Sequence, residues 1–400
     1  MKYIVVLGDG MADEPIAEIG GKTPLAHANT PMMDELAGKS VVGLSATIPE
    51  GMSPGSDTAN LAVLGYNPKK YYTGRSPLEA LSIGVPMKDT DIALRCNIVT
   101  VSEEDVPYAE RTIIDHSSSE ISTEDAAVLL EAVKKELQDD IYSYYVGTSY
   151  RHLLIWDKGQ VVPLTPPHDI LGKVIGDYLP KEAKLREMME KSYDILNNHP
   201  LNVERAAKGL HKANSIWFWG AGTRPALDSF EEKTGKKGVM ISAVDLLKGI
   251  AIGAGMKVIE VPGADGTLHT NYVGKAQAAV DALTKEGYDF AYVHVEAPDE
   301  MGHQGSLPNK LEAIESLDAK VIRTVVEGMK AAGEEFRLLI MPDHPTPIRC
   351  RTHTSDPVPF LLYDSTMERR RIGFYNEEEA KASGILYPEG YKLIDTLFEK

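Results

Sequence analysis

Short apolar runs that each end in a polar loop constrain the fold of this chain most. The first run, residues 4–7, stops at Gly8-Asp9-Gly10 and has the length and β-branched content of a buried strand. Similar runs recur later, at residues 238–241, 258–261, 290–295, 338–341 and 359–363. Helical patterns separate them, at residues 243–253, 272–285 and 309–332. This alternation predicts an α/β fold with a mostly parallel sheet and helices on both faces.

The middle of the chain has a different pattern of predicted strands and helices. Strand patterns are expected at residues 92–101, 111–114, 141–146 and 152–156, and helices at 122–137, 183–196 and 203–210. Strands and helices that do not alternate are typical of an α+β domain. The sequence therefore predicts a core domain, residues 1–88 and 236–400, interrupted by an inserted α+β domain, residues 89–235.

Charge and cysteine content exclude several classes of function. The 400 residues carry 42 Lys and Arg against 59 Asp and Glu, a net charge of −17 that disfavours nucleic-acid binding. Cys96 and Cys350 belong to no CxxC motif, so a thiolate metal cluster is not expected. No apolar run reaches the ~18 residues of a membrane span, and the N-terminal run is too short for a signal peptide. We expect a cytoplasmic protein with no membrane partner and no obligate protein partner.

Two loops in the first sixty residues carry candidate catalytic groups. Asp9 follows the first predicted strand, where a turn aspartate and a metal ligand are both reasonable interpretations. Ser56 follows a Pro-Gly turn at the start of a helix expected at 58–64. A serine there is most often an N-cap, but the helix start also favours phosphate, so a nucleophile is the alternative.

Two more segments follow predicted strands late in the chain. Asp299 and His303 are four residues apart, a spacing that places two metal ligands on one face of a helix. Asp343 and His344 precede a proline, and His353 follows nine residues later.

These segments together provide carboxylate, hydroxyl and imidazole donors. Such a mixed set suits Mn²⁺ or Zn²⁺ better than Ca²⁺. Seven ligands are too many for one tetrahedral site and suffice for two ions. Pairs of metal ions are typical of phosphoryl transfer, and a metal on Ser56 would activate its hydroxyl.

The order of these motifs resembles the alkaline phosphatase superfamily. Within it, residues 54–59, 64–68, 72–80, 299–303 and 343–347 are similar to the cofactor-independent phosphoglycerate mutases, and the archaeal-type branch in particular. The resemblance runs nearly end to end. It implies an alkaline-phosphatase-like core, two divalent metal ions (Mn²⁺ first, Zn²⁺ or Mg²⁺ next), no 2,3-bisphosphoglycerate, and interconversion of 3- and 2-phosphoglycerate through a phosphoserine.

The resemblance also implies roles for individual residues. Ser56 would be the nucleophile. One metal would be held by Asp9, Ser56, Asp343 and His344, and the other by Asp299, His303 and His353. The small phosphorylated substrate would be bound by Lys248 and by groups of the insert and its flanks, namely Arg75, His116, Arg151 and Arg224.

Residues 114–120 depart from the family pattern, because arginines are usual where this chain has Ile-Asp-His-Ser-Ser-Ser-Glu. Ser76 also replaces a usual glycine. These differences match a subgroup for which homoserine kinase activity is proposed. Phosphotransfer to another hydroxyl such as homoserine, and phosphate-ester hydrolysis, therefore remain alternatives. A protein that only binds a phosphorylated ligand, without catalysis, is a weaker alternative, since Ser56 is present together with the other six candidate ligands.

Overall fold

The computed structural model describes residues 1–368 and 373–399 and divides into two compact units. One unit comprises Met1–Tyr72 and Ala226–Lys400, and the other, Thr73–Pro225, is inserted between its two parts. The inserted unit begins before the expected boundary at 89, because helix α5 (Arg75–Ser82) packs on strands of that unit. Ala80 of α5 is fully buried in a small apolar cluster with Ala93 and Leu153.

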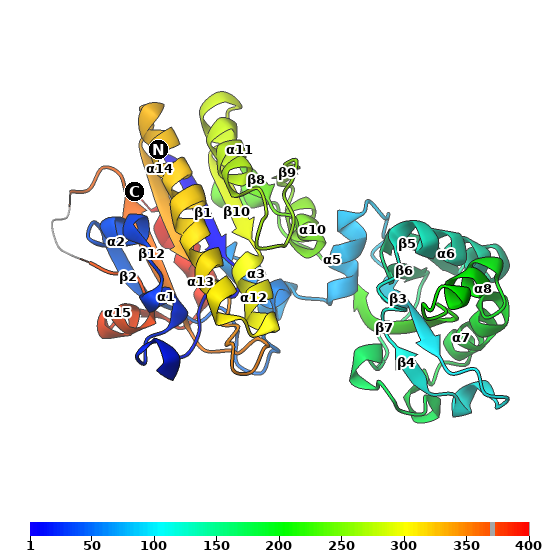
Figure 1. Cartoon of the computed structure of the whole chain (residues 1–400). Helices are drawn as coiled ribbons and strands as arrows, with labels where there is room; N and C mark the ends of the chain where they lie inside the picture. Colours follow the sequence, from blue (N-terminus) through cyan, green and yellow to red (C-terminus); the bar gives the residue numbers. More distant parts are fainter. Residues whose placement is uncertain (369–372, 400) are drawn as a thin grey trace. The chain divides into compact units, whose positions relative to one another are not determined.

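The first unit is built on an eight-stranded sheet (Figure 1). Its strand order is β13-β2-β12-β11-β1-β10-β8-β9. The strands are β1 (Lys2–Gly8), β2 (Ser40–Ser45), β8 (Gly238–Ile241), β9 (Lys257–Val258), β10 (Phe290–Val295), β11 (Phe336–Met341), β12 (Val358–Asp364) and β13 (Leu386–Tyr387). β12 runs antiparallel to β11 and to β2, whereas the other pairs are parallel. The expected mostly parallel sheet is confirmed.

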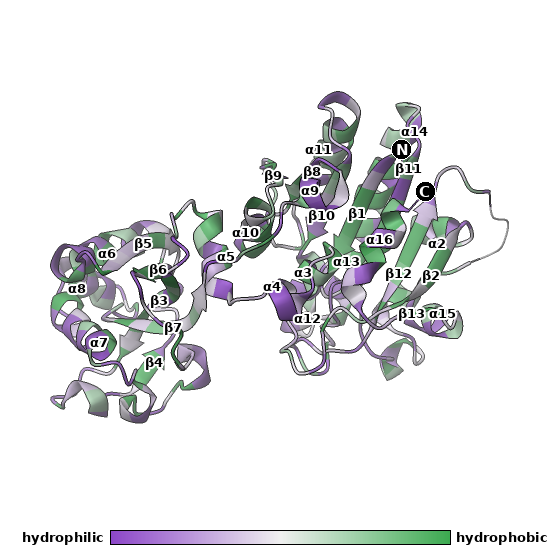
Figure 2. Ribbon diagram, turned by 180° about the vertical axis from the view of Figure 1, so that it is seen from behind, coloured by the Kyte–Doolittle hydropathy of each residue, from purple (hydrophilic) through white to green (hydrophobic). Residues whose placement is uncertain are grey.

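Helices cover both faces of this sheet, as expected. Ile4 and Val6 of β1 belong to a core shared with α2 (Pro31–Ala37), α11 (Tyr272–Lys285), α13 (Leu307–Ser316) and α14 (Arg323–Ala331). Tyr3 points to the opposite face, where its ring lies 5.1 Å from Phe398 of α16 (Leu393–Phe398). Figure 2 shows α16 from that side.

The remaining α-helices described in the first unit have four to nine residues. They are α1 (Pro24–His27), α3 (Ser56–Val63), α4 (Pro68–Tyr71), α9 (Phe230–Thr234), α10 (Asp245–Gly253), α12 (Ala297–Gln304) and α15 (Glu377–Ala382). A π-helical segment (Leu317–Ile322) joins α13 to α14, so the helix expected at 309–332 is continuous but not regular. Strand β2 was not expected from the sequence.

The inserted unit has a five-stranded sheet in which all pairs are antiparallel. Its strands are β3 (Ile92–Val101), β4 (Ile113–Asp115), β5 (Tyr142–Thr148), β6 (Arg151–Trp156) and β7 (Ser215–Thr223), and its longer helices are α6 (Thr123–Leu137), α7 (Ala183–Leu196) and α8 (Pro200–Ala207). β7 is an addition to the expected elements. α8 begins earlier than expected because Pro200, read as a break, occupies the first helical turn, where proline is well tolerated.

The topology of the first unit brings the candidate motifs to one edge of its sheet. β11, β1 and β10 are adjacent and parallel, so their carboxyl ends lie together. Asp9 follows β1, Asp299 follows β10, and Asp343 with His344 follows β11. Among the described residues no helix combines the length and the apolar character that crossing a membrane would require.

Candidate active site

Ser56 is the first residue of α3, and its hydroxyl does not cap the helix. Gly55 occupies the N-cap position, with an extended backbone and no capping side chain. The Ser56 Oγ instead lies 3.0 Å from Nε2 of His344 and 3.3 and 3.4 Å from the two carboxylate oxygens of Asp9. This geometry favours the nucleophile over the N-cap interpretation.

Asp9, Asp343 and His344 form a buried group around that hydroxyl. Nε2 of His344 lies 3.4 Å from Oδ1 of Asp9 and 3.3 Å from Oδ2 of Asp343. Asp343 also accepts a hydrogen bond of 3.0 Å from the backbone N–H of Gly10, which ties the loops after β1 and β11 together. Three oxygen or nitrogen donors therefore converge beside Ser56.

A second group lies on α12 and the loop after Asp343. Asp299 and His303 are one helical turn apart, with Oδ2 and Nε2 separated by 3.2 Å. His353 approaches the other carboxylate oxygen of Asp299 to 3.3 Å and the Nε2 of His303 to 3.0 Å. The rings of His344 and His353 are 3.9 Å apart, so the two groups are neighbours. All seven sequence-derived candidate ligands thus lie in one cluster.

Burial and like charge dominate the electrostatics of the cluster. Burial, with Asp343 and Asp299 nearby, raises the pKa of Asp9 well above its usual value. Burial also opposes ionisation of Asp299, but hydrogen bonds from His303 and His353 hold its pKa well below normal. The hydrogen bond with Asp299 raises the pKa of His303 to about 9. Such a concentration of carboxylates is the environment that a bound cation would stabilise.

Hydrogen bonds orient two of the imidazoles as metal ligands. Nδ1 of His303 lies 2.9 Å from the carbonyl of Arg351, and Nδ1 of His344 lies 3.2 Å from the carbonyl of Pro345. A carbonyl only accepts, so Nδ1 carries the proton in each neutral ring and the lone pair is on Nε2. In both residues Nε2 is the atom that faces the carboxylates, which is the arrangement of metal-binding histidines.

Three residues of the site were not identified from the sequence. His294, inside β10, lies 2.7 Å from Oδ2 of Asp9. Asn60 donates to Oδ2 of Asp343 at 3.0 Å and to the carbonyl of Ser56 at 2.8 Å. The hydroxyl of Thr346 donates to Asp299. Only His294 had a usable signal, a single imidazole in an otherwise apolar strand.

Lys248 and Arg224 form ion pairs with acidic partners. Lys248, on α10, lies 2.9 Å from Glu260. Arg224, at the end of the inserted unit, lies 2.9 Å from Asp89 in an exposed pair. Among the described residues, Lys248 contacts none of the seven clustered residues through an observed hydrogen bond or ion pair.

The other expected substrate-binding residues belong to one polar and aromatic cluster in the inserted unit. Arg75 lies 3.4 Å from Glu79, which also binds Arg95 with a nitrogen–oxygen distance of 2.9 Å. Arg95 stacks on Trp219 at 4.6 Å. The ring centroid of Tyr150 lies 5.7 Å from that of His116 and 5.2 Å from Cζ of Arg151. The His168 ring packs between the rings of His116 and Trp219.

Arg95 belongs to this cluster but was not identified from the sequence. The sequence did show it as a single arginine in an otherwise mostly apolar strand, β3. Arg95 is only 6% exposed. Its partner Glu79 is ionised, because the nearby Arg95 lowers the Glu79 pKa although burial opposes this.

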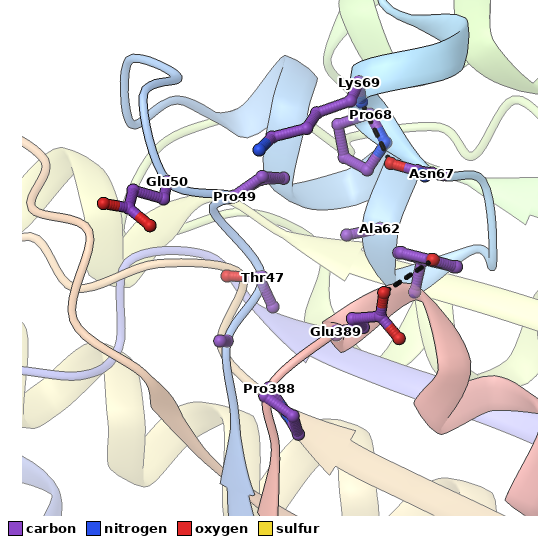
Figure 3. Close-up of a pocket in the computed structure, with 12 residues that line it drawn as sticks. Thr47, Pro49, Glu50, Ala62, Asn67, Pro68, Lys69, Pro388 and Glu389 are labelled. Atoms are coloured by element: carbon purple, nitrogen blue, oxygen red, sulfur yellow. Dashed lines mark hydrogen bonds between the residues drawn. The ribbon is translucent and has the colours of Figure 1, made fainter.

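A separate cavity of about 160 Å³ lies in the first unit (Figure 3). Its wall includes Thr47, Ala62, Lys69 and Glu389, and none of the candidate catalytic or ligand residues. Thr47 does donate a hydrogen bond to the carbonyl of Asp343. The cavity is therefore distinct from the cluster around Ser56.

A serine at a helix start, surrounded by carboxylates and imidazoles at the carboxyl edge of a parallel sheet, defines an enzyme of the phosphoryl-transfer class. A sequence model described as 2,3-bisphosphoglycerate-independent phosphoglycerate mutase matches residues 37–202. The 2,3-bisphosphoglycerate-independent phosphoglycerate mutase of Methanosarcina acetivorans is 46% identical, over 99% of each chain. The chain belongs to this family.

Solved structures agree with that assignment. A protein of Pyrococcus horikoshii superposes with a TM-score of 0.82 at 29% identity, covering 99% of this chain and 96% of its own. The cofactor-independent phosphoglycerate mutase of Thermoplasma acidophilum superposes with a TM-score of 0.65 at 26% identity, covering 99% of each chain. The chain is thus an isomerase that interconverts 3- and 2-phosphoglycerate, and no comparison supports the homoserine alternative.

Proposed function

We propose that Ser56 carries the phosphoryl group between the two positions of phosphoglycerate. The observation that supports this most is the approach of the Ser56 Oγ to His344 and Asp9, at 3.0 and 3.3 Å. The hydroxyl is at the first residue of α3, whose backbone N–H groups and dipole favour a phosphate there. Asn60 binds both the Ser56 carbonyl and Asp343, and so fixes the nucleophile relative to its neighbours.

We propose further that the cluster binds two divalent metal ions. Asp9, Ser56, Asp343 and His344 would bind one, and Asp299, His303 and His353 the other. The Nε2 lone pairs of His303 and His344 and the converging carboxylates support this assignment. The mixed oxygen and nitrogen donors favour Mn²⁺, with Zn²⁺ or Mg²⁺ as alternatives. When bound, such ions neutralise phosphate charge and lower the pKa of the serine hydroxyl.

The inserted unit, in this proposal, binds the glycerate portion of the substrate. Arg75, Arg151 and His116 belong to its polar and aromatic cluster, and Arg95 is added to them. Guanidinium groups bind carboxylates and phosphates through paired hydrogen bonds. Retaining glycerate while Ser56 is phosphorylated prevents loss of the phosphoryl group to water. Lys248 and Arg224 are further candidates that would have to leave their present acidic partners.

The test is phosphorylation of Ser56. Ser56→Ala should remain folded and lose turnover, and brief incubation with labelled phosphoglycerate should label the wild type but not the variant. Ser53→Ala, an exposed serine in the same loop, is the matched control and should behave as wild type. Activity of Ser56→Ala at a tenth of the wild-type value would show that another group accepts the phosphoryl.

A further inference from the structure

A chain of two hydrogen bonds connects Ser242 to His294 and His294 to Asp9. Nδ1 of His294 lies 3.0 Å from the Ser242 Oγ, and its Nε2 lies 2.7 Å from Oδ2 of Asp9. All three side chains are buried, and His294 is completely so. The fold explains the meeting, because Ser242 follows β8, which is the parallel neighbour of β10, and β10 in turn neighbours β1.

The direction of these hydrogen bonds assigns the tautomer of His294. Burial and nearby carboxylates raise the pKa of Asp9 in the metal-free chain. As a metal ligand, however, Asp9 would be an ionised carboxylate that only accepts, so Nε2 of His294 would then carry a proton. The Ser242 Oγ already accepts the backbone N–H of Val244 at 3.0 Å. The other hydrogen bond observed for the Ser242 hydroxyl is with Nδ1 of His294, at 3.0 Å. Ser242 therefore donates to His294, and His294 donates to Asp9.

This tautomer is the opposite of that in His303 and His344. In those residues Nδ1 donates to a carbonyl, so Nε2 holds the lone pair when the ring is neutral, as metal binding requires. In His294 the nitrogen that faces the carboxylates holds a hydrogen, although it lies within 4.8 Å of ligand atoms of both Asp9 and Asp343. A ring in this state cannot coordinate a metal through Nε2, so proximity alone does not make His294 a ligand.

We propose that His294 is a positioning residue that orients Asp9 for its role beside Ser56, with Ser242 fixing the His294 tautomer. His294 occupies Oδ2 of Asp9, which leaves Oδ1 directed at His344, 3.4 Å from its Nε2. Lys275, also fully buried, donates to the His294 carbonyl at 3.2 Å and fixes the end of β10. The proposal rests on the metal assignment made above.

Mn²⁺ binding to the full chain distinguishes a positioning residue from a ligand. His294→Ala should bind as many ions as wild type, but with affinity reduced by about 10- to 100-fold, the usual effect of removing a group that orients a ligand. His294→Gln, whose amide can still donate to Asp9, should recover much of that loss. Asp343→Ala is the reference for a lost ligand. Loss of an ion from His294→Ala, or unchanged affinity, would overturn the proposal.

Ser242 provides a second route if His294→Ala does not fold. Ser242→Ala removes the hydroxyl and should weaken Mn²⁺ several-fold, whereas Ser242→Thr keeps the hydroxyl and should not. Equal Mn²⁺ affinities for Ser242→Ala and wild type would contradict the role of Ser242 in fixing the His294 tautomer.

Nitrogen NMR of ¹⁵N-histidine protein tests the tautomer directly, and His294→Gln identifies the signal. With Mg²⁺ bound, the His294 ring should show a protonated Nε2. A ring protonated at Nδ1 with Mg²⁺ bound would refute the assignment. If wild type binds no Mn²⁺, the metal proposal fails; if wild type binds Mn²⁺ and His294→Ala binds it equally well, only the role of His294 is refuted.

Discussion

The Oγ of Ser56 lies 3.0 Å from Nε2 of His344, although 288 residues separate them in the sequence. Ser56 begins α3, and His344 follows β11 beside the loop of Asp9. This contact places the proposed nucleophile against the histidine and carboxylates of a proposed metal site. A metal bound there would activate the Ser56 hydroxyl for attack on phosphate.

Removing a proposed ligand should remove an ion. Asp343→Ala should lose about one bound Mn²⁺ per chain, measured by equilibrium dialysis with elemental analysis, because Asp343 is fully buried and its carboxylate lies 3.3 Å from Nε2 of His344. Asp364→Asn, at the end of β12, is the control and should bind as wild type. Full metal retention by Asp343→Ala would refute the ligand assignment.

The buried ion pair between Lys310 and Asp13 should contribute strongly to stability. Lys310 is fully buried, lies 2.9 Å from Asp13, and also donates to the carbonyls of Ala12 and Thr346. Lys310→Ala leaves the Asp13 charge without its cation and should lower the free energy of unfolding by about 3–5 kcal/mol. Urea denaturation measures this.

Lys285→Ala is the matched control for that measurement, since it breaks an exposed pair with Asp281 and should cost about 0–1 kcal/mol. Similar decreases in the free energy of unfolding for the two variants would contradict the prediction that the buried pair stabilises the fold more than an exposed pair does.

His152 should make the protein less stable in acid. Burial lowers its pKa to about 4 from 6.5. Between these values the unfolded chain binds a proton that the native chain does not, so this contribution to stability falls as the pH falls from 6.5 towards 4. The loss amounts to about 3 kcal/mol when complete.

His152→Gln should remove that part of the pH dependence. The difference between wild type and variant in unfolding free energy, measured by denaturant titration at pH 7 and pH 4.5, isolates it. The exposed His269→Gln is the control and should leave the wild-type slope unchanged. Parallel pH profiles for wild type and His152→Gln would contradict the prediction.

Arg151 should matter for phosphoglycerate binding. Its side chain is exposed at the start of β6 and contacts the ring of Tyr150, within the cluster that contains His116. Loss of a desolvated charge contact costs about 2–5 kcal/mol, so Arg151→Ala should reduce kcat/KM at least tenfold. Metal content should not change.

Two comparisons sharpen this test. Arg224→Ala should have a smaller effect than Arg151→Ala, because Arg224 already pairs with Asp89. Arg186→Ala, on the exposed side of α7, should have none. If Arg151→Ala and Arg224→Ala both match wild type in a coupled assay, the substrate is bound by other residues, with Arg95 the next to test.

Local patterns in the sequence were sufficient for most of the strands, the longer helices and the seven clustered residues, but not for β2 and β7. β10 and α11 lie where apolar runs and helical periodicity place them, and Asp9, Asp299 and Asp343 stand out because each follows a buried strand. Such signals are local, since strand and helix formation depends on neighbouring residues.

Only the tertiary structure decided which atoms of these residues face one another. Strand pairing brings His294 against Asp9 and Arg95 against Trp219, and neither pair is close in sequence. The same holds for Ser56, which the sequence left open between cap and nucleophile, because the choice depends on His344 lying opposite it. The residue types thus follow from the sequence, whereas orientation and protonation depend on contacts that folding alone creates.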